Sequence, residues 1–188
     1  MSNNFWANPL LWIGAYLMGY TITIVVLSLP GMQTKVKNRI PKPIVRIFIL
    51  LTFIAPIIAL PFTKGPRIAI LTPVALTVGI ILLGINFIIK ILAQKEIGIA
   101  PALKSKGSLV TRGVYGTVRN PLYMSNFLLA VGMAVLLKSM YALLFSIPYA
   151  LLYLPIIHFE EKELLEKYGE EYKEYKRKVP WRMIPKLL

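Results

Sequence analysis

The sequence predicts an all-helical membrane protein, a polytopic bundle of about five transmembrane helices with a cytosolic amphipathic helix at the C-terminal end. Two observations support this prediction. Of the 188 residues, 56% are hydrophobic, whereas about 45–50% is usual in soluble domains, and the mean hydropathy is +0.64. The apolar residues are also gathered into long runs, and so short a chain cannot bury that much apolar surface away from water.

The first half of the chain contains three long apolar runs, at residues 10–29, 44–62 and 68–92. Each run is close to the ~20 residues that a helix needs to cross the hydrocarbon core of a bilayer. No Lys or Arg precedes the first run, so it is not typical of a signal peptide and we expect a retained helix. The second run is interrupted by Pro56 and Pro61. A polar basic loop at residues 32–42 is expected between the first two runs, and a tight turn at residues 63–67 follows the second.

The second half contains two shorter apolar runs, at residues 122–137 and 140–157. Lys138 and Ser139 alone separate them, which predicts a tight helical hairpin. Beyond this hairpin the sequence becomes charged, and residues 158–178 have a helical pattern in which Gly169 is expected to break or kink the helix. One face of this pattern carries Ile157, Glu161, Leu164, Tyr168, Tyr172 and Tyr175.

The positive charge is concentrated in three segments. Nineteen of the 22 Lys and Arg residues lie within residues 35–46, 90–119 and 162–186, which follow the first, third and fifth runs and so share one side of the membrane. The positive-inside rule makes that side cytosolic and places the N-terminus outside. This bias accounts for the net charge of +14 without a nucleic-acid partner. We expect the cytoplasmic membrane of a prokaryote or the endoplasmic reticulum of a eukaryote.

The composition excludes several chemistries. The chain has no cysteine and a single histidine, His158, so it offers no thiolate nucleophile, no disulfide and no cysteine or histidine metal site. No metal is predicted. All eight acidic residues are glutamates, and seven of them lie between Glu160 and Glu174.

Residues 109–123 form a polar segment that leads directly into the fourth apolar run. Pro121 suits the first turn of a helix, and Asn120 before it is a plausible N-cap. The partial positive charge of a helix start, with the forked donor of Arg119 beside it, suits an anionic ligand group. The alternative is that Arg119 is one more positive-inside residue and that Asn120 is only a cap.

A pair of adjacent carboxylates, Glu160 and Glu161, follows the fifth run. Charge at a membrane boundary is costly and often functional, and carboxylates can bind sugar hydroxyls or an ammonium group. The alternative is a solvated helix start, where acidic residues are favoured. Because the hairpin joins the two polar segments, we expect Arg119 and both carboxylates to face each other at one cytosolic mouth. Packing or interface anchoring explains the tyrosine stripe more simply than ligand binding.

These residues carry a family resemblance. The order Gly113-x-Tyr115, Arg119-x-Pro121-x-Tyr123, a hairpin, Glu160-Glu161, Tyr168-Gly169-x-x-Tyr172-x-x-Tyr175 and a final Val-Pro…Ile-Pro resembles the isoprenylcysteine carboxyl methyltransferase family, which is related to the phospholipid methyltransferases. The likeness covers residues 109–185. Where that family has a histidine this chain has Asn120, which cannot titrate near neutral pH, and this departure puts a histidine-based role in doubt.

The resemblance implies S-adenosylmethionine-dependent methyl transfer to a lipophilic or lipidated acceptor at the cytosolic membrane face. The methyl acceptor would be a carboxylate, amine or hydroxyl of an isoprenoid- or lipid-type molecule. Residues 93–188 would form the catalytic region, after three N-terminal transmembrane helices within residues 1–92. Arg119 and Glu160 would be catalytic, and the donor would be bound by Leu109, Val110, Gly113, Tyr115, Arg119, Asn120, Pro121, Tyr123, Glu160, Glu161 and Tyr168.

Two alternatives remain open from the sequence. Membrane sterol reductases, which use NADPH, share a similar Arg-x-Pro-x-Tyr segment and a similar ending, but they usually have more spans. The adjacent Glu160-Glu161 pair favours the methyltransferase. The third possibility is a non-enzymatic membrane scaffold whose pocket is unused.

Overall fold

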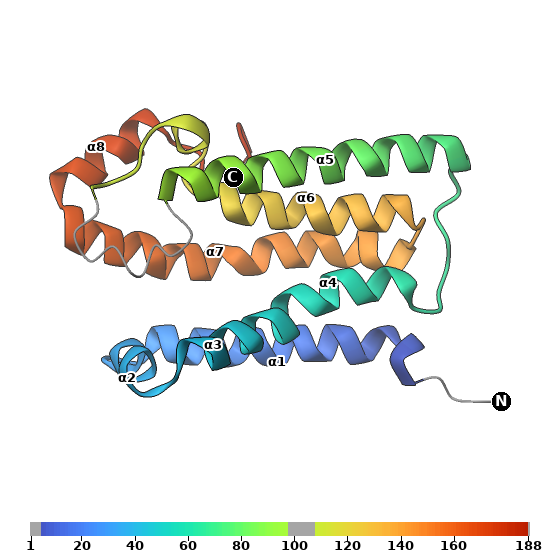
Figure 1. The fold of residues 1–188 in the computed structure, drawn as a ribbon, viewed down its shortest axis with the longest axis horizontal. Coiled ribbons are helices and arrows are strands. Elements are labelled where there is room, and N and C mark those ends of the chain that lie inside the picture. Colours follow the sequence, from blue (N-terminus) through green and yellow to red (C-terminus); the bar gives the residue numbers. More distant parts are fainter. Residues whose placement is uncertain (1–4, 98–107, 188) are drawn as a thin grey trace.

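The structure, a computed structural model, describes residues 5–97 and 108–187. Within these residues every regular element is helical, and the long helices lie side by side along the longest axis of the molecule (Figure 1). The α-helices are α1 (Pro9–Ser28), α2 (Met32–Arg39), α3 (Lys42–Ile49), α4 (Ala55–Ala59), α5 (Thr72–Ile97), α6 (Pro121–Leu136), α7 (Met140–Tyr168) and α8 (Glu170–Lys178). Short 3-10 turns cover Phe5–Ala7, Leu60–Phe62 and Gly113–Gly116, and a π-helical turn covers Leu50–Ile54.

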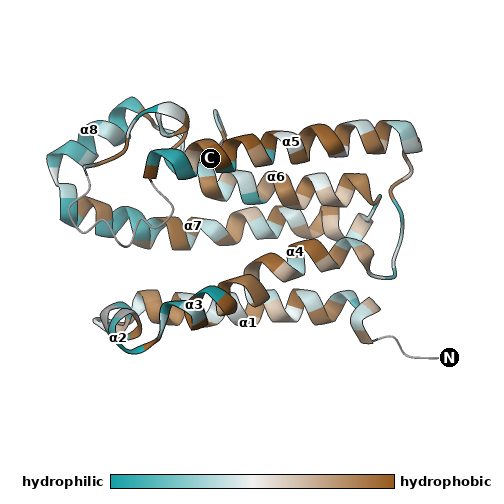
Figure 2. Cartoon of the chain, in the orientation of Figure 1, coloured by the Kyte–Doolittle hydropathy of each residue, from teal (hydrophilic) through white to brown (hydrophobic). Residues whose placement is uncertain are grey.

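Four helical stretches are long and apolar enough to cross a membrane: Pro9–Ser28, Lys42–Phe62, Thr72–Ile97 and Met140–Tyr168. At most 39% of the most apolar window of any of them is buried inside the protein, so most of their large side chains face outward, as helices in lipid require. Figure 2 shows that most of α5 consists of hydrophobic residues. The predicted polytopic helical membrane bundle is confirmed, with the 16-residue helix α6 as its short fifth member.

The second apolar run folds as a helix whose pitch changes along its length. α3 passes into the π-helical turn, then into α4, and ends in the 3-10 turn Leu60–Phe62. The changes fall beside Pro56 and Pro61, because proline lacks the N–H that a regular helix would use. The predicted interruption by these two prolines is therefore confirmed.

The basic segment between the first two runs is not the loop that the sequence predicted. Met32–Arg39 forms α2, which begins after Gly31 at a φ of 72°. Glycine adopts this left-handed conformation without strain, so the chain turns sharply there. The next residues contain no glycine or proline until Pro41, and they are free to form two turns of helix.

The predicted hairpin is confirmed, but its second helix is longer than the apolar run. α6 and α7 are joined by Leu137–Ser139, and the Ser139 side chain caps α7 by accepting a hydrogen bond from the Ala142 N–H. α7 then continues through the charged residues for 29 residues and ends at Gly169, the predicted break. Glu160 and Glu161 therefore lie well inside a continuous helix, and the alternative of a helix start at this pair is wrong.

The basic segments gather at one end of the bundle. α2, the segment around Gly113–Gly116 and α8 lie at this end, whereas the turn after α4 and the α6–α7 connection lie at the other (Figure 1). At that opposite end, the Ile68 N–H donates to the Lys138 carbonyl and the Met140 N–H donates to the Pro66 carbonyl. The prediction that the basic segments share one side of the bundle agrees with this arrangement.

Candidate functional site

The start of α6 is held by the C-terminal segment, residues 179–187. The Arg119 N–H donates to the Trp181 carbonyl at 2.9 Å, and the Asn120 N–H donates to the Arg182 carbonyl at 2.8 Å. Asn120 occupies the N-cap position as predicted, but its side chain does not cap the helix. Its Nδ2 instead donates to the Arg182 carbonyl at 3.1 Å, so this residue fastens the C-terminal segment.

Arg119 and Glu161 form a buried ion pair behind this segment. The Arg119 Nε lies 2.8 Å from Glu161 Oε1, and both side chains are only 5% exposed. The Arg119 Nη1 also donates to the Val179 and Pro180 carbonyls, at 2.7 Å each. Lys176 and Arg182 lie 3.7 and 3.6 Å from the other Glu161 oxygen. A buried charge needs such partners to offset its lost hydration, and here the protein itself supplies them.

Glu160 lies in different surroundings from Glu161. Successive residues of a helix are about 100° apart, so the two neighbouring carboxylates point in different directions. The Tyr123 hydroxyl of α6 donates to Glu160 Oε1 at 2.6 Å. The Tyr123 ring packs against Tyr153 of α7, with 4.4 Å between the ring centroids. The expected mouth is therefore split, with Arg119 beside Glu161 and Tyr123 beside Glu160.

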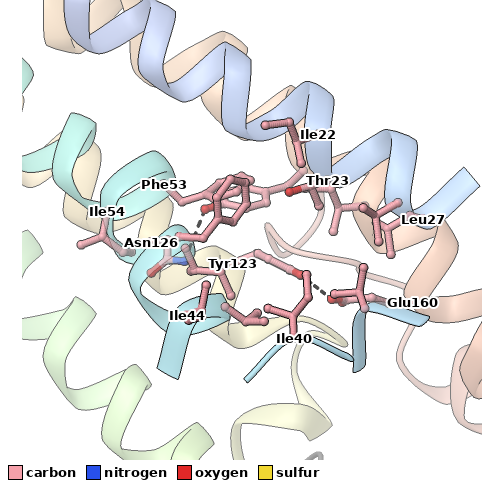
Figure 3. Close-up of a pocket in the computed structure, with 17 residues that line it drawn as sticks. Ile22, Thr23, Leu27, Ile40, Ile44, Phe53, Ile54, Tyr123, Asn126 and Glu160 are labelled. Carbon is pink, nitrogen blue, oxygen red and sulfur yellow. Dashed lines mark hydrogen bonds between the residues drawn. The ribbon is translucent and has the colours of Figure 1, made fainter. Parts of the chain in front are cut away.

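Glu160 and Tyr123 line a cavity of about 460 Å³, which we call the apolar cavity. It lies between α1, α2 and α3 with the π-helical turn on one side and α6 and α7 on the other (Figure 3). Its apolar walls include Ile22, Leu27, Ile40, Ile44, Phe53 and Ile156. α6 and α7 supply most of its polar groups, including Asn126, whose Nδ2 donates to the Tyr153 hydroxyl at 3.4 Å.

A second cavity of about 550 Å³, which we call the polar cavity, lies at the basic end of the bundle. Its walls come from the end of α5, residues 108–112, the end of α7 and α8, and they include Tyr115, Tyr168, Tyr172 and Tyr175. Two of its charged residues, Arg112 and Glu96, form an ion pair at 2.9 Å. Lys167 lies over the Tyr168 ring, 4.9 Å from its centroid, which shows that a tyrosine face here can receive a cation.

The two cavities approach each other along α7, because Glu160 lines the apolar cavity and Leu164, about one helical turn further on, lines the polar one. Burial raises the pKa of the Tyr115 hydroxyl to about 12, and the nearby Glu160 carboxylate adds to this shift. Tyr115 lines the polar cavity, and Glu160 lines the apolar one. The Tyr115 carbonyl accepts a hydrogen bond of 2.8 Å from the Tyr175 hydroxyl, which fixes this segment to α8. An apolar ligand and a polar ligand would thus meet beside Glu160.

The predicted site residues fall into three groups. Five line the polar cavity, namely Leu109, Val110, Tyr115, Arg119 and Tyr168. Two line the apolar cavity, namely Tyr123 and Glu160. Among the described residues, the remaining four line neither of these cavities, namely Gly113, Asn120, Pro121 and Glu161.

Gly113 nevertheless shapes the polar cavity. Its φ is +59°, and a Cβ at this position would lie 3.0 Å from Glu96 Oε1. Both the backbone conformation and the close approach of Glu96 therefore require glycine here. Pro121 is fully buried at the first turn of α6.

Sequence reasoning missed most of the apolar cavity. Thr23, Phe53, Asn126 and Tyr153 line it, and none was predicted as a site residue. Asn126 gave a usable signal, because a carboxamide within an apolar run is costly unless it has a partner or a function. The apolar walls gave none, because side chains that line a cavity and side chains that face lipid are equally hydrophobic.

Comparison with known proteins identifies one family over half of the chain. A family model described as phospholipid methyltransferase matches residues 74–171 of the 188. The match begins near the start of α5 and ends at the start of α8. It includes most of the polar cavity, whereas the walls that α1, α2 and α3 give to the apolar cavity lie outside it.

Three curated proteins are similar over shorter segments. The protein-S-isoprenylcysteine O-methyltransferase of Schizosaccharomyces pombe is 38% identical over 73 residues, which are 38% of this chain and 31% of that protein. The Delta(14)-sterol reductase of Mus musculus is 36% identical over 86 residues, which are 41% of this chain and 19% of that protein. The nickel-cobalt-cadmium resistance protein NccN of Alcaligenes xylosoxydans xylosoxydans is 36% identical over 73 residues, which are 38% of this chain and 34% of that protein.

The chain thus spans about a third or less of the length of each of these relatives. The family match and the first relative confirm the predicted resemblance to the membrane methyltransferases. The second relative matches the predicted likeness to sterol reductases. Within the described residues, no three His, Cys, Asp or Glu side chains are grouped as a metal site would require.

Proposed function

Because the chain belongs to the phospholipid methyltransferase family, we propose that it transfers a methyl group from S-adenosylmethionine to a lipophilic acceptor. The observation that carries this proposal is the approach of two unlike cavities along α7, where Glu160 of one lining and Leu164 of the other lie about one helical turn apart. A polar ligand from the cytosol and an apolar ligand from the bilayer would be brought together there. Such alignment of two reactants supplies a large part of enzymatic rate enhancement.

The polar cavity suits the methyl donor. S-Adenosylmethionine carries a sulfonium methyl group, an adenine ring and an amino acid end. The tyrosine rings of the cavity offer aromatic faces for a cation or a base, and the Glu96 carboxylate can accept from an ammonium or a ribose hydroxyl. The Tyr115 hydroxyl, whose pKa burial raises from 10 to about 12, is protonated at neutral pH and is therefore a hydrogen-bond donor.

Arg119 and Glu161 are proposed as positioning residues. Their charges pair with each other, and Arg119 also binds two carbonyls of the C-terminal segment. They would hold that segment and the start of α6 as the rear wall of the polar cavity. This proposal replaces the expectation that Arg119 acts directly in catalysis, and it leaves Glu160 as the proposed catalytic group.

The proposed topology follows from the position of the basic segments. Residues 93–188 would form the catalytic region, made of the cytosolic loop, the helical hairpin and the cytosolic C-terminal helix. Within residues 1–92, α1, α2 and α3 wall the apolar cavity from the other side. The C-terminal end would be cytosolic and the N-terminus outside, as the positive-inside rule predicts. The membrane would supply the acceptor.

A second candidate function is NADPH-dependent reduction, which the similarity to a Delta(14)-sterol reductase favours. NADPH brings three phosphates, and phosphate sites are usually built from Arg and Lys. Of the basic residues that line the polar cavity in the described chain, Arg112 and Arg119 already pair with Glu96 and Glu161. Lys167 is the other one. This charge distribution favours S-adenosylmethionine.

Calorimetric titration of the detergent-purified protein with S-adenosylhomocysteine and with NADPH tests the proposal. We expect saturable binding of S-adenosylhomocysteine alone, weakened by Tyr168→Ala in the polar cavity. Tyr141→Ala is the matched control, because Tyr141 lies on the same helix near its other end and is 40% exposed. Binding of NADPH alone would favour the reductase, and binding of neither would favour a non-enzymatic scaffold.

A further inference from the structure

We infer that the methyl acceptor carries an uncharged or cationic head with an O–H or N–H group, and that Glu160 receives its proton. The juxtaposition that supports this inference is a carboxylate in the wall of a cavity whose other described lining residues are uncharged. The inference deepens the proposed function and rests on it, because it takes the apolar cavity as the acceptor site. It excludes a carboxylate as the methylated group.

The charge of the apolar cavity is the first step of the argument. Of the 17 residues that line it (Figure 3), Glu160 alone is charged, and no Lys or Arg is among them. An acceptor carboxylate in this cavity would place a second negative charge beside the first. Two carboxylates that share a poorly hydrated site repel each other and cannot both stay ionised.

The basic residues beside the neighbouring Glu161 are already engaged with it, which is the second step. Arg119 pairs with Glu161 and with two carbonyls, and Lys176 and Arg182 also lie beside Glu161. Among the described residues, Glu160 takes part in no ion pair. The site therefore offers an anion without its own cation, which suits a hydrogen-bond donor or a cationic head.

The geometry around Glu160 is the third step. Tyr123 holds Oε1 through a hydrogen bond of 2.6 Å, and the packing of its ring on Tyr153 restrains it. No other described residue is recorded as donating to this carboxylate, so Oε2 is the oxygen available to a ligand. Glu160 also lies about one helical turn from Leu164, which lines the polar cavity.

The chemistry then balances in a single displacement. As the acceptor attacks, its O–H or N–H proton passes to Glu160 Oε2, and the electron pair of that oxygen or nitrogen forms the bond to the methyl carbon. The carbon–sulfur bond of the donor breaks, and its electron pair stays on the sulfur, which becomes a thioether. A carboxylate acceptor would need no such base, so Glu160 would have no task in that reaction.

Binding of three C16 amphiphiles tests the inference without any methyl donor. Hexadecan-1-ol, hexadecylamine and hexadecanoic acid are titrated onto the full chain in non-ionic detergent at pH 9, where the acid is ionised, and bound ligand is counted by native mass spectrometry. We expect the alcohol or the amine to bind at least about tenfold more tightly than hexadecanoate, since a charge-assisted hydrogen bond has about this value. The tighter of the two identifies the head as an alcohol or an amine.

Three variants make the test specific. Glu160→Gln keeps the side-chain size and removes the charge, and it should reduce the tenfold preference to less than about threefold. Tyr123→Phe keeps the carboxylate but removes the hydrogen bond to its Oε1, so it should narrow the preference less than Glu160→Gln does. Glu163→Gln is the matched control, because Glu163 is exposed on the same helix and lines neither cavity.

Two results would overturn the inference: hexadecanoate binding as tightly as the other two amphiphiles, or a preference that Glu160→Gln leaves unchanged. Absence of saturable binding by all three would also overturn it. S-Adenosylhomocysteine is titrated onto the same samples. If it does not bind while the head-group preference holds, the proposed function fails and the assignment of the cavity survives. If it binds and the preference is absent, the inference alone fails.

Discussion

The two cavities are similar in volume, about 460 and 550 Å³, but they are built in opposite ways. The apolar cavity is walled by side chains from both halves of the chain, including α1, α2 and α3, and Glu160 is its one charged residue. Within the described part of the chain, the polar cavity is walled only by residues from 96–97, 108–119 and 164–175, and it contains paired charges and four tyrosines. The region that matches the family, residues 74–171, covers most of the polar cavity and only part of the apolar one. Under the proposed function, the shared part of the family would hold the donor and the N-terminal helices would shape the acceptor site.

The largest expected effect is a loss of stability when the buried ion pair beside the polar cavity is broken, compared with an exposed ion pair of the same cavity. Arg119→Ala would leave Glu161 buried without its closest partner, and it should lower the free energy of unfolding by about 3–5 kcal/mol. Arg112→Ala should cost less than about 1 kcal/mol, because the Arg112 side chain is 86% exposed and such ion pairs are weak. Thermal unfolding in detergent measures both. Equal losses would show that the buried pair has no special role.

A smaller loss of stability, together with weaker ligand binding in the polar cavity alone, is expected from a substitution at Gly113. Gly113→Ala introduces a side chain at a φ of +59° and toward Glu96, which should cost about 1–2 kcal/mol. We expect weaker binding of S-adenosylhomocysteine and unchanged binding of hexadecan-1-ol.

Gly116→Ala is the matched control for Gly113→Ala. Its nearest neighbour to an added Cβ is the Thr111 carbonyl oxygen at 3.5 Å, an ordinary contact, and its φ is not positive. If Gly113→Ala weakened the binding of both ligands equally, the two ligands would not occupy independent cavities.

The sequence predicted elements with a strong local signal. Each apolar run became a helix, the two residues Lys138 and Ser139 became a hairpin turn, and Gly169 separated α7 from α8. The length of α7 was missed because the end of an apolar run was taken as the end of a helix. Charged residues such as Glu163 and Lys167 are good helix formers, so the helix continued after the lipid-facing part ended.

The sequence predicted the polar cavity better than the apolar one for a physical reason. Polar side chains in loops are few and stand out, and five of the predicted residues do line the polar cavity. A helix that is apolar on all sides has no periodicity to show which face turns inward. The different surroundings of Glu160 and Glu161 also depend on the rotation of α7 against α6, which packing sets.

A pH titration tests whether Tyr115 is buried and close to Glu160. Burial and the nearby Glu160 raise the pKa of Tyr115 to about 12. The absorbance titration of the wild-type protein, after subtraction of the titration of Tyr115→Phe, should therefore show a tyrosinate step near pH 12. An unburied tyrosine would give this step near pH 10. Because the unfolded chain releases this proton first, Tyr115 should contribute less to stability as the pH rises from about 10 to 12. A step near pH 10 would place Tyr115 away from Glu160 and in water.

The smallest effect is expected on the exposed face of α8. Lys178→Ala removes an ion pair with Glu174 at 2.8 Å whose side chains are 73% and 59% exposed. The loss of stability should be too small to resolve, and neither ligand should bind differently. Isothermal titration and thermal unfolding check this together. A clear loss of S-adenosylhomocysteine binding would extend the polar cavity onto the outer face of α8.

The unbroken course of α7 has a consequence for how this protein can diversify. The same rigid helix places Tyr153, Ile156 and Glu160 in one cavity and Leu164, Lys167 and Tyr168 in the other. With a rise of about 1.5 Å per residue, the separation of the two linings is set by backbone geometry rather than by loops. Substitutions in α1, α2 and α3 can therefore reshape the acceptor wall and leave the distance to the donor wall unchanged. A lineage could change its lipid repertoire in this way while the reacting centres stay aligned.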